Sequence, residues 1–62
     1  MPSTNKPTAL VVDDYATMRR KLVTAVRGLG YSVSEAQNGV EALTRLRESS
    51  FDLLFTDLVM PE

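Results

Sequence analysis

The fold is decided by a short stretch near the start of the chain, ALVVDD at residues 9–14. Its first four residues form a continuous apolar run rich in branched side chains, which is typical of a strand buried on both faces of a parallel sheet. Two aspartates then end the run abruptly. Residues 9–12 are therefore predicted to form a strand that carries Asp13 and Asp14 at its carboxyl end.

Helical and extended patterns alternate along the rest of the chain. Apolar side chains at spacings of three and four predict helices over residues 16–29 and 39–49. Residues 31–36 alternate in polarity and suit an edge strand, and residues 51–56 form a third apolar strand. This order predicts parallel strands joined by right-handed crossovers. The expected core positions of the two helices are Met18, Leu22, Val23, Ala25, Val26, Leu29, Val40, Ala42, Leu43 and Leu46.

The ends of both helices carry local signals. Gly30 is expected in the left-handed conformation just past the first helix. Asp14 or Thr17 is the candidate N-cap of that helix. Asn38 with Glu41 three residues later resembles a capping box, which predicts turn and cap chemistry at the start of the second helix.

Composition narrows the function classes. The 62 residues contain no cysteine and no histidine, so any metal would need oxygen ligands, as magnesium, calcium and manganese do. A net charge of −1 gives no electrostatic footprint for nucleic acid. No apolar run reaches the length of a membrane span, and residues 1–7 are polar without the apolar core of a signal peptide. We expect a cytoplasmic chain with a loose tail over residues 1–7 and one unit over residues 8–62.

Carboxylates end two of the three predicted strands, with Asp13 and Asp14 after the first and Asp57 after the third. If these strands are neighbours, as the strand order 2-1-3 would make them, the acids converge in one crevice at the carboxyl edge of the sheet. Three carboxylates that close together either take up protons or bind a cation. Mg²⁺ suits such ligands, and a carboxylate beside it is a candidate nucleophile for phosphoryl transfer.

These residues resemble a known family, the response-regulator receiver domains, especially the single-domain chemotaxis type. The run LVVDDYATMRR (residues 10–20) is similar to the family's first strand and helix. QNGVEAL (residues 37–43) is similar to its second-helix entry, and FDLLFTDLVMP (residues 51–61) to its third strand and phosphorylation loop. The resemblance covers residues 8–62 and implies the N-terminal half of a flavodoxin-like, doubly wound α/β fold with strand order 2-1-3.

The resemblance also implies roles for individual residues. Asp57 would take phosphate from a sensor histidine kinase or a phosphotransfer domain. Asp14 would bind Mg²⁺ directly, Asp13 through a bound water, and Val59 through its backbone carbonyl. Asp57 would be the fourth ligand of the same ion. The chain would thus be a phosphoacceptor and not an enzyme. In the family two more strands and three more helices follow. The half that ends at Glu62 is therefore expected to be inactive by itself and to bind Mg²⁺ weakly or not at all, whereas the complete domain is expected to bind it.

A different kind of function stays open beside this one. The chain would be a structural, self-associating fragment if its third strand is a bare sheet edge, because exposed edges pair with other chains. This alternative predicts a homodimer or higher oligomer, including one that exchanges elements.

Each of these residues, taken singly, also has a purely structural interpretation. Asp13 and Asp14 would then only end a strand and cap a helix, Asp57 would be an ordinary loop acid, and residues 19–21 are expected to form a solvated basic face. An enzyme of another class is disfavoured, because the first strand is followed neither by Gly-x-Gly-x-x-Gly nor by a P-loop. A phosphatase with paired Asp-x-Asp acids would need a second acid where Val59 stands.

Overall fold

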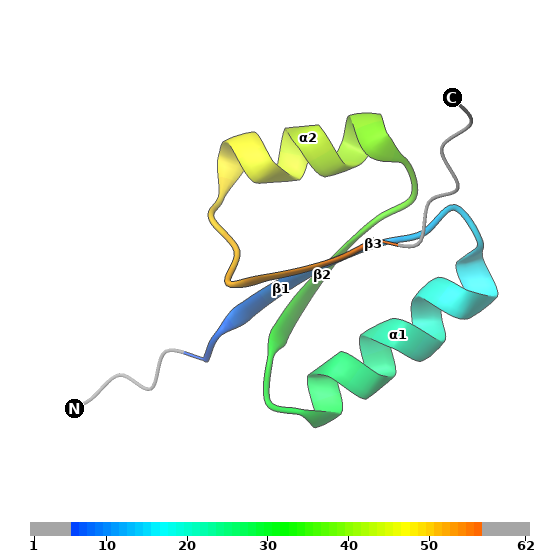
Figure 1. The fold of residues 1–62 in the computed structure, drawn as a ribbon, viewed down its shortest axis with the longest axis vertical. Coiled ribbons are helices and arrows are strands. Elements are labelled where there is room, and N and C mark those ends of the chain that lie inside the picture. Colours follow the sequence, from blue (N-terminus) through cyan, green and yellow to red (C-terminus); the bar gives the residue numbers. More distant parts are fainter. Residues whose placement is uncertain (1–5, 57–62) are drawn as a thin grey trace.

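A computed structural model describes residues 6–56 as alternating strands and helices (Figure 1). The elements are β1 (Thr8–Val12), α1 (Ala16–Gly28), β2 (Ser32–Ala36), α2 (Gly39–Glu48) and β3 (Leu53–Thr56). Each lies within two residues of its predicted bounds. Asp57, Val59 and most of the predicted tail, residues 1–5, lie outside the described residues.

The three strands form one parallel sheet in the order β2-β1-β3, which confirms the predicted strand order. On one side β1 pairs with β2 from Thr8 opposite Ser32 to Val12 opposite Ala36. On the other side β1 pairs with β3, and Val12 lies opposite Thr56. The fully apolar run therefore takes the centre of the sheet, where both of its faces are covered.

One helix packs on each face of the sheet (Figure 1). Because side chains alternate along a strand, β1 sends Ala9 and Val11 to the α1 face, and these pack with Val23 and Val26. Its Leu10 faces α2 together with Val12. On that side the buried cluster is completed by Ala36 of β2 and Ala42 of α2.

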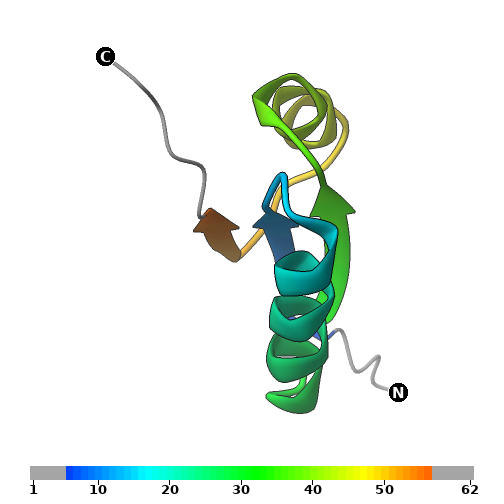
Figure 2. The ribbon, with the colours of Figure 1, turned by 90° about the vertical axis from the view of Figure 1, so that its right-hand side faces the viewer.

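The prediction of which helix residues are buried is mostly wrong. Six of the ten expected core positions are exposed, and only Val23, Val26 and Ala42 are buried, with Leu22 partly so. The reason lies in how the helices sit: both cover β1 and β2, and β3 stands to one side of them (Figure 2). The exposed positions are Met18, Ala25, Leu29, Val40, Leu43 and Leu46.

The helix ends are partly as predicted. Gly30 has a φ of 100°, the left-handed value expected just past α1. The Asn38 side chain accepts a hydrogen bond from the Glu41 N–H at 2.8 Å, which confirms the predicted cap of α2. The predicted N-cap of α1 is wrong, because the cap position is Tyr15 and no side chain there caps the helix. Neither helix in residues 6–56 is long and apolar enough to cross a membrane.

Candidate functional site

The acid pair lies where β1 leaves the sheet. The Asp13 N–H donates to the Ala36 carbonyl at 3.1 Å, which continues the β1–β2 pairing one residue beyond the strand. Asp13 is consequently buried, with 2% of its surface exposed, whereas Asp14 is exposed. Two neighbouring aspartates therefore have opposite environments, one fixed against the sheet and one facing solvent.

The carboxylate of Asp13 is only half satisfied. Its Oδ1 accepts a hydrogen bond from the Tyr15 N–H at 2.9 Å, which closes the turn between β1 and α1. Its Oδ2 is buried and has no hydrogen-bond partner among the residues that the structure describes. A buried carboxylate oxygen without a partner is costly, so this atom calls for a cation or a further donor.

The two aspartates fit a hard divalent cation. Mg²⁺ takes oxygen ligands, usually one or two carboxylates, and keeps several waters. Within residues 6–56 no group of three or more metal-ligating side chains is present. Of the four ligands implied by the resemblance, Asp13 and Asp14 are adjacent in the loop after β1, and Asp57 and Val59 lie outside the described residues.

Arg19 is a residue of this corner that the sequence interpretation missed. The basic run at residues 19–21 predicts a solvated face, but only 16% of the Arg19 side chain is exposed. Its Nη1 donates to the Asp13 carbonyl at 2.9 Å, and its Nε donates to Glu35 Oε1 at 3.0 Å. The signal was present in the spacing, because Arg19, Val23 and Val26 follow one another at four and three residues, as one buried helix face requires.

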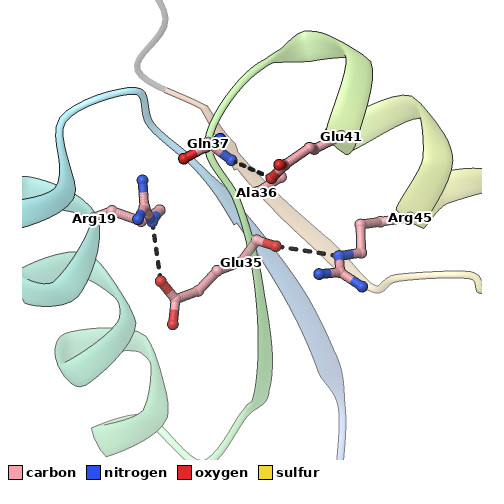
Figure 3. Close-up of a pocket in the computed structure, with 6 residues that line it drawn as sticks. All are labelled: Arg19, Glu35, Ala36, Gln37, Glu41 and Arg45. Atoms are coloured by element: carbon pink, nitrogen blue, oxygen red, sulfur yellow. Dashed lines mark hydrogen bonds and ion pairs between the residues drawn. The ribbon is translucent and has the colours of Figure 1, made fainter.

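A polar hollow of about 240 Å³ lies beside the acid pair, between the two helices (Figure 3). Arg19 of α1, Glu35 of β2 and Arg45 of α2 all contribute to it, and Arg45 Nε donates to the Glu35 carbonyl at 3.2 Å. Neither Asp13 nor Asp14 lines the hollow. The hollow is therefore a neighbour of the acidic site, connected to it through Arg19.

A parallel β-α-β-α-β unit with carboxylates beyond its central strand defines a class of protein, the flavodoxin-like α/β domains, of which these strands and helices form a part. The family model for the response regulator receiver domain matches residues 9–62. The chain belongs to this receiver family.

Curated relatives agree with this family. The chain is 43% identical over 61 residues to the transcriptional regulatory protein ResD of Bacillus subtilis, an alignment that covers 98% of this chain and 25% of ResD. It is 49% identical over 53 residues to the response regulator receiver protein CpdR of Brucella abortus, covering 86% of this chain and 44% of CpdR. The chemotaxis protein CheY of Pseudomonas aeruginosa is 45% identical over 53 residues, with 84% and 43% covered.

The chain thus spans less than half the length of these curated relatives. No solved structure matches it significantly.

Proposed function

We propose that this chain is the phosphoacceptor part of a receiver domain, which takes a phosphoryl group onto Asp57 from the phosphohistidine of a sensor histidine kinase or a phosphotransfer domain. One observation carries the proposal: the buried Asp13 oxygen without a described partner lies at the edge where β1 and β3 both end. Asp57 directly follows Thr56, the register partner of Val12, and Asp13 directly follows Val12.

The proposed step is a displacement at phosphorus. A carboxylate oxygen of Asp57 forms a bond to phosphorus while the bond between phosphorus and the imidazole nitrogen breaks. The nitrogen keeps the electron pair and takes a proton from solvent, and Asp57 becomes an acyl phosphate. Such transfers depend mainly on positioning and on compensation of negative charge.

Asp13, Asp14, Asp57 and the Val59 carbonyl are the proposed ligands of Mg²⁺. When bound, the ion supplies positive charge that offsets the acids and the phosphoryl oxygens. Asp13 contributes through a bound water held by its buried carboxylate, and Oδ1 of that carboxylate already accepts a hydrogen bond from the Tyr15 N–H. Asp14 is exposed and therefore accessible to a hydrated ion.

The names of the relatives support a role in phosphate reception but do not point to one regulated process. ResD is named as a transcriptional regulator, CheY as a chemotaxis protein, and a further relative from Myxococcus xanthus as a gliding motility regulator. What the chain shares with all three is the receiver segment, so the proposal is limited to phosphate reception. We further propose that the 62 residues alone are inactive, because β3 is half exposed and has no second neighbour within the described residues.

A chimaera tests the acceptor role separately from the inactivity of the half. Residues 9–62 would replace the matching segment of P. aeruginosa CheY, and the product would be incubated with Mg²⁺ and phosphoramidate, whose P–N bond imitates phosphohistidine. Intact mass should show one added phosphoryl group that Asp57→Asn abolishes. The control is Asp52→Asn, the same exchange at an aspartate at the opposite end of β3, where Oδ2 accepts from the Thr8 N–H at 2.8 Å.

A folded chimaera that gains no phosphoryl group would reject the acceptor role. A gain by the 62-residue chain equal to that of the chimaera would reject the proposed inactivity of the half. Equal loss of phosphorylation in Asp57→Asn and Asp52→Asn would show that the loss reflects a disturbed fold and is not specific to Asp57.

Self-association is a second candidate function, and the geometry of β3 favours it. Leu54 and Phe55 are 50% and 40% exposed, and their register partners Leu10 and Val11 face opposite sides of the sheet. A strand that is apolar on both faces is typical of a sheet interior. We propose that β3 pairs with a second copy of the chain.

Sedimentation velocity decides this alternative. The chain should sediment as a dimer or larger, and Leu54→Lys should shift it toward monomer because the charge would be placed on the buried interface. Thr24→Lys, at an exposed position of α1, is the matched control and should leave the assembly unchanged. A parent chain that stays a compact monomer at high concentration contradicts the proposal.

A further inference from the structure

Arg19 joins the acidic loop to the edge strand of the sheet. Its Nη1 bonds the Asp13 carbonyl and its Nε bonds the Glu35 carboxylate, and Figure 3 shows the second of these contacts. A guanidinium is planar and carries its five donors in fixed directions. Two acceptors held by one guanidinium are therefore fixed relative to each other as well as to the helix.

Asp13 is held at three points as a result. Its N–H is bonded to Ala36, its carbonyl to Arg19, and its Oδ1 to the Tyr15 amide. The peptide groups on both sides of the residue and one carboxylate oxygen are thus tied down. The remaining oxygen, Oδ2, is left in a fixed place without a partner among residues 6–56.

Glu35, the residue that binds the Arg19 side chain, is also held by a residue of α2. Glu35 accepts from Arg19 through its side chain and from Arg45 Nε through its backbone carbonyl. A continuous set of contacts therefore runs from α2 through β2 and α1 to the loop that carries the acids. The polar hollow of Figure 3 is the space that these groups surround.

We propose that Arg19 is a positioning residue for the acidic site, which fixes the Asp13 backbone so that Oδ2 is presented to Mg²⁺. This inference rests on the function proposed above. Arg19 does not touch the ion in this proposal and acts only through Asp13. An ordinary surface ion pair contributes little to stability. The Arg19–Glu35 pair differs from one because Arg19 also donates a hydrogen bond to the carbonyl of a buried residue, Asp13.

The test uses the 62-residue chain with Arg19→Ala, Arg19→Lys and the matched control Arg20→Ala, an exposed arginine on the next position of the same helix. The first measurement is amide hydrogen exchange by NMR without metal. Arg19→Ala should speed exchange at Asp13 and Tyr15 by roughly tenfold, because the loop opens locally, and leave the core amides of β1 unchanged.

The second measurement is an Mg²⁺ titration followed by the same amide signals. Arg19→Ala should weaken Mg²⁺ binding by roughly tenfold, as the loss of groups that orient metal ligands does elsewhere. Arg19→Lys keeps one charged donor and should recover part of both effects, and Arg20→Ala should match the parent.

The outcomes separate the two proposals. Unchanged exchange at Asp13 and Tyr15 in Arg19→Ala, or an equal change in Arg20→Ala, overturns the positioning role. Global unfolding of Arg19→Ala also overturns it, because the role is local. A parent chain that shows no response to Mg²⁺ counts against the proposed metal site, and the exchange data still decide whether Arg19 holds the loop.

Discussion

Two valines provide a matched test of which helix faces are buried. Val23 of α1 is 5% exposed and Val40 of α2 is 75% exposed, although both belong to the apolar stripes of their helices. Truncating each to alanine removes the same two methyl groups from the same kind of element. The difference between the two variants therefore measures burial and little else.

The expected magnitudes follow from this exposure. Removing two buried methyl groups costs about 1.6 kcal/mol of transfer free energy, and the cavity left behind adds to it. Alanine returns about 0.5 kcal/mol through its higher helix propensity. Val23→Ala should thus lower the free energy of unfolding by about 1–2 kcal/mol. Val40→Ala should change it by less than about 0.5 kcal/mol in either direction.

Thermal and urea unfolding followed by circular dichroism provide the assay. A domain of this size has a total stability of about 3–9 kcal/mol, so the loss in Val23→Ala is a large fraction of it. The midpoint temperature should fall by roughly 4–8 °C for each kcal/mol. Runs at several protein concentrations separate folding from association. Equal destabilisation by both variants at low concentration would refute the assignment of the buried faces.

Two further predictions concern the ends of the helices. Asn38→Ala should destabilise the chain by about 1 kcal/mol in urea unfolding, because the Glu41 N–H loses its side-chain acceptor, and Asn38→Asp should retain most of the stability. Gly30→Ala should cost about 1 kcal/mol or more since φ is 100° there, whereas Gly39→Ala, at a helical position with open space around it, should be neutral or stabilising; effects of the same sign and size at both glycines would contradict this.

The core of α2 shows why periodicity alone misled. Ala42 is the buried contact of this helix, and Val40 lies two positions earlier, which is about 200° around the helix axis. Apolar residues at spacings of three and four indicate that a helix buries one face. The same pattern fits several rotations of the helix about its axis, each of which buries a different subset of these residues. The sheet underneath selects one register, and here a small alanine, Ala42, is the residue of α2 that joins the buried cluster.

Arg19 shows the opposite error. A basic run at residues 19–21 suggested solvent, yet the first of the three is in phase with Val23 and Val26. Its charge is accepted because Glu35 and the Asp13 carbonyl lie within hydrogen-bond distance. Those partners come from residues 6 and 16 positions away in the chain, so no local pattern could have named them.

The sequence by itself determined the order of strands and helices, the central place of β1, the caps at Asn38 and Gly30, and the acid pair at a strand end. These features depend on local chemistry: branched apolar runs, left-handed glycine and polar caps act over a few residues. Only the tertiary structure decided which apolar positions are covered, that Asp13 is buried while Asp14 is exposed, and that Arg19 ties the acidic loop to β2. These three features depend on contacts between segments that are far apart in the sequence and meet around the sheet. Such packing, unlike the helix or strand propensity of a segment, cannot be predicted from any one stretch of the chain.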